Sequence, residues 1–249
     1  MNISCNPAAQ QHDDDCRNPP PSAAAAQPCY YYYHRSRNMM MMAPNKHTAA
    51  RLLLVVGMQN DKLSAMAWGG EEASLRRDGA VPATPAANQF RAEVNSCIAF
   101  AAASGWKIAY VLDVHHPKHS SFQGHGGAMR QHCVLSTWGC NPVSGMHFGM
   151  RGSELIIRGV DTDGDSADAF CITTTPQNKD PTCLRALLAK KKAPLLVVCG
   201  ASPDGCIENT AASALEMGFR VCAVEKALWL RAGVALPHGV RRASSVNDV

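Results

Sequence analysis

The sequence lacks any apolar run near the roughly 20 residues that a membrane-spanning helix needs. Its longest apolar stretches, around Leu52–Met58 and Leu195–Ala201, have the length of buried strands. The N-terminus also lacks a basic segment followed by an apolar one and a cleavage site, which argues against a secretory signal peptide. We therefore expect a soluble protein that does not use a membrane.

Cysteine is abundant, but the patterns of a disulfide framework are missing. The 11 cysteines are an odd number and include no CxxC pair. Cys97, Cys199 and Cys222 lie inside apolar runs, where a free cysteine behaves as a small hydrophobic residue. A reducing setting fits this usage best, so we expect a cytoplasmic protein.

The sequence has no large excess of charge of either sign. The 24 Lys and Arg residues against 20 Asp and Glu residues give a formal net charge of +4, and the basic residues are scattered along the chain. No stripe of basic residues alternates with aromatic ones, as a nucleic-acid surface would require. We therefore expect no nucleic-acid partner.

Residues 1–48 differ in composition from the rest of the chain. Runs of Asp, Pro, Ala, Tyr and Met follow one another there without a helical or strand period, which predicts a disordered segment. A mitochondrial presequence is the alternative, although Asp13–Asp15 and the scarcity of arginine argue against it. The methionine run also leaves open a translation start near Met42. We expect one folded domain over residues 49–240 and a flexible tail over residues 241–249.

Short apolar runs alternate with helical stretches through the folded part. These runs are nearly continuous in apolar content, as in parallel strands covered on both faces. They are Leu52–Val56, Trp106–Leu112, Glu154–Ile157, Leu195–Cys199 and Phe219–Val224. Helices are expected from the N-cap Thr84, over Pro181–Lys192 and over Cys206–Met217. This order predicts an α/β fold, a three-layer α/β/α sandwich with a mostly parallel, doubly wound sheet, whose chemistry gathers outside the carboxyl ends of the strands.

Candidate metal ligands follow the second apolar run. Asp113, His115 and His119 lie close together in the sequence, and His132 comes thirteen residues after His119. One carboxylate and three imidazoles suit Zn²⁺, Fe²⁺ or Mn²⁺ with coordination positions left open. Histidines in surface loops are more often solvated side chains, and spacing alone leaves that alternative open.

A candidate nucleophile follows the fourth apolar run. Residues 199–205 form a tight turn that leads into a helix with Cys206 at its N-terminus. The backbone amides and the positive end of the helix dipole would stabilise a thiolate there. The same amides could form an oxyanion hole. A merely buried cysteine is the alternative.

These patterns together resemble the cysteine hydrolases of the isochorismatase superfamily, and most closely the nicotinamidases. The shared blocks occur in the same order with similar spacing, which makes them more specific than any single motif. They are Val55–Asp61, Asp113–His115 with His119, His132–Val134, Arg158–Gly159 with Asp165–Phe170, and Gly200–Cys206.

The resemblance implies conversion of nicotinamide to nicotinate and ammonia through a thioester on Cys206, as a step of NAD salvage. It implies a divalent metal, Zn, Fe or Mn, on Asp113, His115, His119 and His132. The backbone amides of Ser202 and Cys206 would be the oxyanion donors, with a cis peptide at Ala201–Ser202. The partner would be a small-molecule amide substrate, and a helix-mediated homo-oligomer is also implied.

The catalytic positions depart from this family pattern. Gly57 stands where the family has its aspartate base, whose proton transfers typically accelerate such reactions about 10²–10⁴-fold. Arg158 stands where the family has a lysine, so the positive charge is kept but in a different shape. In the pocket, Lys62, Met129 and Ala167 replace aromatic residues and remove stacking partners for a planar ring.

Three interpretations follow from these departures. The first is a working nicotinamidase-like amidohydrolase in which Asp61 or Asp204 serves as the base. The second is a cysteine hydrolase of the same fold that acts on another small amide or imide, with Lys62 pairing an anionic substrate. The third is a catalytically silent paralogue that binds metal and small ligands or pairs with an active homologue.

Overall fold

The computed structural model describes residues 51–67, 84–160, 164, 166–174, 179–189 and 195–249. The segment 1–48, which the sequence predicts to be disordered, lies outside the described residues.

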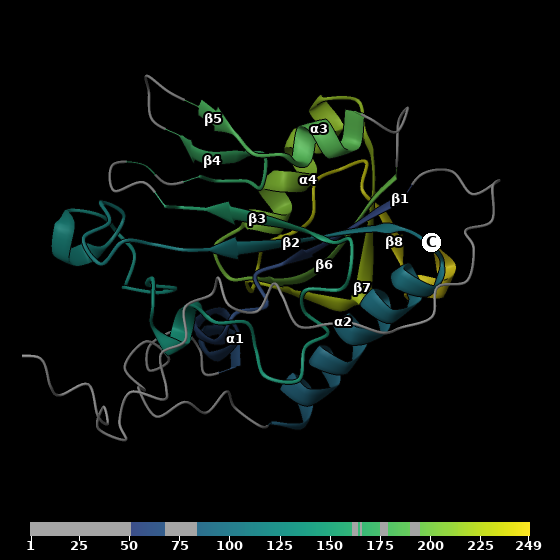
Figure 1. The fold of residues 1–249 in the computed structure, drawn as a ribbon, viewed down its shortest axis with the longest axis horizontal. Coiled ribbons are helices and arrows are strands. Elements are labelled where there is room, and N and C mark those ends of the chain that lie inside the picture. The colour runs from purple at the N-terminus through teal and green to yellow at the C-terminus, as the bar shows by residue number, and fades with distance from the viewer. Residues whose placement is uncertain (1–50, 68–83, 161–163, 165, 175–178, 190–194) are drawn as a thin grey trace, which may run out of the picture.

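A six-stranded parallel sheet forms the centre of the described chain (Figure 1). Its strands are β1 (Arg51–Val56), β2 (Lys107–Asp113), β3 (Glu154–Arg158), β6 (Leu195–Ser202), β7 (Arg220–Leu230) and β8 (Arg241–Ala243). They lie in the order β3-β2-β1-β6-β7-β8, and each neighbouring pair is parallel. A separate antiparallel pair consists of β4 (Cys171–Thr174) and β5 (Lys179–Pro181). The five predicted apolar runs are the strands β1, β2, β3, β6 and β7.

Helices cover both faces of the sheet, with α1 (Asn60–Ala67) and α2 (Pro85–Ala103) on one face and α3 (Leu184–Ala189) and α4 (Cys206–Glu216) on the other (Figure 1). Alternate residues of β1 divide between the two layers, as the two-residue period of a strand requires. Leu53 packs in the cluster that contains Phe90 of α2, whereas Leu54 packs in the cluster that contains Ile207 of α4. The predicted three-layer sandwich is therefore confirmed.

Helix α2 begins and ends where its sequence signals place it. The Thr84 side chain accepts a hydrogen bond from the amide of Ala87 at 3.1 Å, and Pro85 follows at the first helical position. The periodic residues Phe90, Val94 and Ile98 are buried, and Gly105 follows the helix with φ +70°. The predicted helix over Pro181–Lys192 is shorter, because α3 spans Leu184–Ala189 and residues 190–192 lie outside the described part.

The expectation of a flexible tail over residues 241–249 is wrong. Residues Arg241–Ala243 form β8, which extends the sheet beside β7, and Val246–Asp248 form a short 3₁₀ helix. Ala243 and Val246 are buried in the cluster under α2. A three-residue strand with two arginines carries no apolar run, so the sequence pattern gave no signal for it.

The strand order places the ends of β1 and β6 at the centre of the fold. The chain runs from β1 outward to β2 and β3, whereas β6, β7 and β8 extend in the opposite direction. Such a switch point opens a crevice outside the carboxyl ends of the strands, where ligands bind in open α/β sheets.

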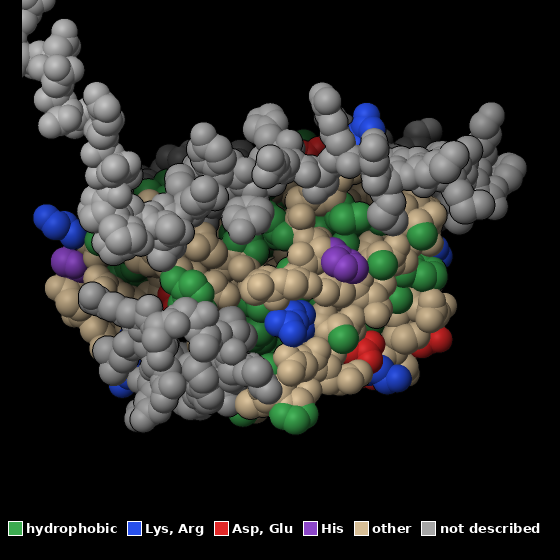
Figure 2. All heavy atoms as spheres, turned by 60° about the horizontal axis from the view of Figure 1, so that its bottom comes forward, with side chains coloured by type: hydrophobic (Ala, Val, Ile, Leu, Met, Phe, Trp, Pro, Cys, Tyr) green, Lys and Arg blue, Asp and Glu red, His purple; other side chains and the backbone are tan. Residues whose placement is uncertain are grey.

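The surface agrees with the charge pattern of the sequence. On the face that Figure 2 shows, the Lys and Arg side chains are separated from one another and do not gather into a patch. Among the described residues, no helix has both the length and the apolar content needed to cross a membrane.

Candidate active site

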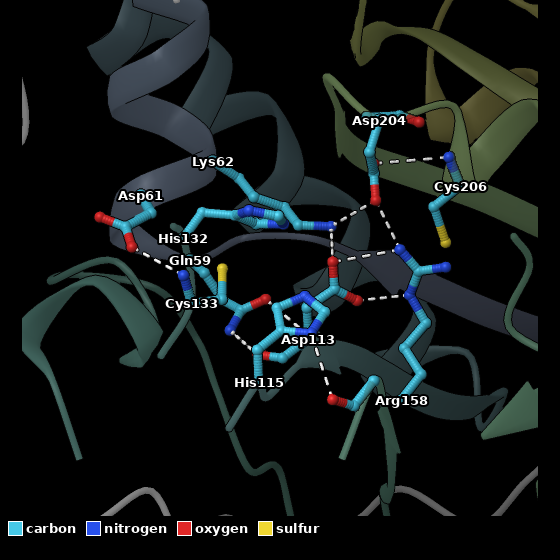
Figure 3. A network of polar contacts seen from close by, with 12 residues as sticks. Gln59, Asp61, Lys62, Asp113, His115, His132, Cys133, Arg158, Asp204 and Cys206 are labelled. Atoms are coloured by element: carbon cyan, nitrogen blue, oxygen red, sulfur yellow. Dashed lines mark hydrogen bonds and ion pairs between the residues drawn. The ribbon is translucent and has the colours of Figure 1, made fainter. Parts of the chain in front are cut away.

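The predicted site residues come from strand ends at the switch point (Figure 3). Asp113 is the last residue of β2, Arg158 the last of β3 and Ser202 the last of β6, while Cys206 opens α4. The buried Gln59 side chain fixes the end of β2, because its Nε2 donates to the Asp113 carbonyl at 2.7 Å and its Oε1 accepts from the Asp113 amide at 2.8 Å.

Four charged side chains form one network at this edge of the sheet. The Arg158 guanidinium binds Asp113 through Nε and, at 3.1 Å, through Nη2, and its Nη2 also lies 2.5 Å from Oδ2 of Asp204. The Lys62 ammonium group binds Oδ2 of Asp113 and lies 3.0 Å from Oδ2 of Asp204. Lys62, Arg158 and Asp113 are buried, and the Asp204 side chain is 16% exposed. Asp204 is therefore the member of the network that a substrate can reach most easily.

Burial and ion pairing oppose each other in this network. Burial alone would raise the pKa of both carboxyl groups, but the charges of Arg158 and Lys62 hold the pKa of Asp113 well below its usual value. The same two cations lower the pKa of Asp204. Burial would lower the pKa of Lys62, yet the two carboxylates raise it above its ordinary value. All four groups are therefore charged near neutral pH.

Cys206 lies at the start of α4 beside the guanidinium of Arg158 (Figure 3). Its thiol is buried, and burial raises the pKa of Cys206 to about 12 although the charge of Arg158 acts in the opposite direction. Sγ lies 3.8 Å from Oγ1 of Thr210, one helical turn further along. The thiol is therefore protonated at neutral pH in this arrangement and needs a base before it can attack.

The predicted oxyanion donors lie on either side of a turn. The amide of Cys206 lies 3.5 Å from Oδ1 of Asp204, at the limit of a hydrogen bond. The Ser202 hydroxyl donates to Oε2 of Glu208 at 2.6 Å and accepts from the amide of Ile207 at 3.0 Å. The expectation of a cis peptide at Ala201–Ser202 is wrong, since the structure has a trans bond there.

Three of the four predicted metal ligands come together. The ligand atoms of Asp113, His115 and His132 lie within 4.8 Å of one another. Nδ1 of His115 lies 3.1 Å from the carbonyl of Gly159, and Nδ1 of His132 lies 2.9 Å from the carbonyl of Arg130. A carbonyl only accepts, so each Nδ1 carries the proton and each Nε2 carries the lone pair that a metal needs. The chemistry of this donor set fits a divalent cation.

The structure does not bring His119 into this group. Its Nε2 lies 3.1 Å from the carbonyl of Gly164, and its Nδ1 lies 2.7 Å from the hydroxyl of Ser121. Both ring nitrogens therefore have hydrogen-bonding partners, one in the same loop and one in the segment after β3, and the ring packs edge-on to His115 with centroids 4.7 Å apart. His119 supports the position of His115 rather than offering a fourth ligand atom in this arrangement.

Lys62 occupies the space beside Gly57, where the family has its base. Gly57 has φ +61°, and a Cβ atom there would lie 2.9 Å from Cδ of Lys62 and would collide with the carbonyl oxygen of Ala201. The family resemblance placed Lys62 in the substrate pocket, and the second of the three interpretations had it pair with an anionic substrate. Instead its ammonium group pairs with Asp113 and Asp204, which no local pattern could indicate because the partners lie 51 and 142 residues away in the sequence.

Asp61, the other candidate replacement base, lies away from Cys206. Its Oδ2 accepts from the amide of Cys133 at 2.7 Å, and its carboxylate packs where a side chain at Gly139 would stand. Figure 3 shows this carboxylate on the side of the network away from Cys206. Of the two candidate replacement bases, only Asp204 adjoins the cysteine.

The other two altered pocket positions lie nearer the surface. Met129 is half-buried and Ala167 is exposed, and the carbonyl of Ala167 accepts from the Asn209 side chain at 3.1 Å. Neither residue supplies an aromatic face for a planar substrate.

Comparison with known proteins adds to this geometry. The family model of the isochorismatase domain matches residues 51–245. No curated protein matches the chain. A solved structure of PnC1 from L. infantum in complex with nicotinate is 28% identical, with a TM-score of 0.57 over 76% of this chain and 84% of that one.

Two further structures, of lower sequence identity, share the fold. Pyrazinamidase of Pyrococcus horikoshii in complex with zinc is 22% identical, with a TM-score of 0.58 over 78% of this chain and 98% of that one. The yeast nicotinamidase Pnc1p, bound to the inhibitor nicotinaldehyde, is 20% identical, with a TM-score of 0.54 over 74% and 89%.

Proposed function

This chain belongs to the isochorismatase family, and on that premise we propose that it hydrolyses the amide bond of a small carboxamide of the nicotinamide class through Cys206. The observation that carries the proposal is the position of Cys206 at the N-terminus of α4, beside the Arg158 guanidinium and the carboxylate of Asp204. The 28% identical relative whose structure contains nicotinate supports this substrate class. Turnover of nicotinamide would yield nicotinate for NAD salvage.

In the proposed reaction Cys206 attacks the carboxamide carbon, and its thiol proton passes to Asp204. The carbon–nitrogen bond then breaks, the proton returns to the departing ammonia, and a thioester remains on the sulfur. Water next attacks the thioester carbon and gives its proton to Asp204, which returns it to the cysteine as the acid is released. Arg158 stabilises the thiolate, and the Cys206 amide is the candidate oxyanion donor.

Asp113, His115 and His132 would hold a divalent metal, Zn, Fe or Mn, beside this cysteine. His119, the fourth ligand that the family resemblance implies, would need to give up one of its hydrogen bonds before it could join them, since both of its ring nitrogens have partners. When bound, the metal supplies an open Lewis-acidic position that orients a ring nitrogen of the substrate.

The test is ammonia release from nicotinamide by the full chain with Zn²⁺, Fe²⁺ or Mn²⁺ added. We expect Cys206→Ala to abolish release, while Cys183→Ala, which changes an exposed cysteine, retains it. A second variant tests the proposed base. Asp204→Asn should lower kcat roughly 10²–10⁴-fold, the usual contribution of a general base. Glu216→Gln, on the exposed side of α4, is the matched control. Release that survives Cys206→Ala would contradict the proposal.

A second candidate function is a catalytically silent protein that binds metal and small ligands. The observation that favours it is the mismatch between the proposed acid and base in the resting site. Burial raises the pKa of Cys206 to about 12, while Lys62 and Arg158 lower the pKa of Asp204, so transfer of the thiol proton is unfavourable there. Absence of ammonia from folded protein that binds metal would favour this candidate or a different amide substrate.

A further inference from the structure

We propose that the ammonium group of Lys62 and a divalent cation compete for one carboxylate oxygen, Oδ2 of Asp113. The cation then joins the Asp113, His115 and His132 group only when Lys62 moves off that oxygen. Lys62 would thereby set the metal affinity of the protein. This inference concerns metal binding alone and does not depend on amide turnover.

The contacts of Asp113 carry the first step. Its Oδ1 accepts from Nε of Arg158, and its Oδ2 binds the ammonium group of Lys62 and lies 3.1 Å from Nη2 of Arg158 (Figure 3). Each oxygen of the carboxylate therefore already has a cationic donor. A zinc ion would bind such an oxygen at about 2.0–2.2 Å, and so would lie directly beside the ammonium group. Like charges at that separation in a buried site repel strongly.

The charge count of the network supports the same conclusion. Lys62 and Arg158 supply two positive charges, and Asp113 and Asp204 supply two negative charges. A divalent cation added to this balanced set leaves an excess of two positive charges in a buried place. The least costly adjustment is for one of the two side-chain cations to leave Asp113.

Lys62 can move off Asp113 more easily than Arg158 can. Its ammonium group already lies 3.0 Å from Oδ2 of Asp204, so it keeps one carboxylate partner after it leaves Oδ2 of Asp113. Arg158 is held by Asp113 through two donors and by the carbonyl of Ser166 at 2.6 Å. The two histidines need no rearrangement, because each already donates Nδ1 to a backbone carbonyl. Competition therefore acts through Lys62 and Asp113.

The test is titration of the chelator-treated full chain with Zn²⁺ alone, followed by calorimetry or by competition with a chromophoric chelator. Lys62→Met keeps the length of the stem and removes the charge. We expect this variant to bind one zinc ion per chain at least about tenfold more tightly than the wild type, because the repulsion is gone. Lys226→Met, which changes an exposed lysine on β7, should leave the affinity unchanged. The double variant K62M/H132A should lose the gain, which places the ion at this group.

Equal or weaker zinc binding by Lys62→Met would overturn the proposal, and so would a gain that survives the loss of His132. If Lys62→Met fails to fold by circular dichroism, a crystal structure of the wild type soaked in Zn²⁺ decides. Zinc at Asp113 with the Lys62 ammonium group displaced supports the proposal. Zinc at Asp113 with Lys62 still on Oδ2 refutes it.

Discussion

Gly57 and Lys62 are best understood as a pair. The space that a side chain at position 57 would need is crossed by the stem of Lys62, and the carbonyl of Ala201 closes the remaining side. The glycine also has φ +61°, a conformation that residues with a Cβ rarely adopt. The loss of the family's aspartate and the gain of the lysine are thus structurally linked, and restoring the aspartate alone is not a simple reversal.

We therefore predict that Gly57→Asp destabilises the protein and does not raise nicotinamide hydrolysis. The matched control is Gly152→Asp, since Gly152 has φ +77° and open space around its missing Cβ. Both variants bear the cost of positive φ, of order 1–3 kcal/mol. Only Gly57→Asp adds the collision, which costs about another 1–3 kcal/mol as overpacking does. Urea unfolding of the two variants measures the difference.

Equal unfolding free energies for the two variants would mean that the Ala201 carbonyl and Lys62 give way without cost. A large gain in hydrolysis by Gly57→Asp would instead identify the chain as a nicotinamidase that lost only its base. That outcome would also show that the resting position of Lys62 is easily abandoned.

Among the elements, β8 offers the clearest test of a contribution to the free energy of unfolding. It pairs with β7 from Cys222 to Val224, and the following Val246 is buried under α2. We predict that deletion of residues 241–249 lowers the free energy of unfolding by roughly 2 kcal/mol or more, since burial of one valine alone contributes about 1.5–3 kcal/mol. Uncovering the β7 edge should also promote association between chains.

Arg242→Ala is the control for this deletion. Arg242 forms an exposed ion pair with Glu225 at 3.5 Å, with side chains 55% and 47% exposed, so its loss should change the stability little. Urea unfolding followed by circular dichroism, together with light scattering, measures both effects. If the deletion variant is as stable and monodisperse as the full chain, residues 241–249 behave as the flexible tail that the sequence indicated.

The elements differ in how much the sequence could reveal about them. The buried strands and α2 were predictable because burial on both faces, caps and helical periodicity are local signals. Helix α1 and strand β8 were not predicted, because their short sequences carry no such period and depend on packing against other parts of the chain.

The same limit applies to the site. Asp113 and Cys206 could be placed just after strands from the order of the apolar runs, whereas Arg158 was indicated only by the family resemblance, and the structure brings the three together. Whether His119 joins His115 and His132 depends on which backbone carbonyls its ring meets. The partners of Lys62 depend on the sheet bringing residues from three distant segments together. Neither set of contacts can be predicted from a local stretch of sequence.

For the molecule as a whole, the buried charge network links stability to pH. The pKa of Asp204 lies below its ordinary value of 3.8, because the charges of Lys62 and Arg158 outweigh the effect of burial. A carboxyl group whose pKa is lower in the folded state stabilises that state above the unfolded pKa. This contribution is lost as the pH falls through the folded pKa, so the network favours folding near neutral pH and ceases to do so in acid.

We therefore predict that the free energy of unfolding falls as the pH drops below about 4, and that Asp204→Asn falls less steeply than the wild type over that range. At neutral pH Asp204→Asn should be the less stable protein, because Lys62 and Arg158 each lose a charged partner while they remain buried. Urea unfolding at pH 7 and at several acid values measures both effects, with Glu216→Gln as the control for removing one exposed carboxylate. A wild-type protein and an Asp204→Asn variant with the same acid dependence would mean that Asp204 is no better paired in the folded state than in the unfolded chain. The ion pairs of Asp204 with Lys62 and Arg158 would then contribute nothing to the stability of the folded protein.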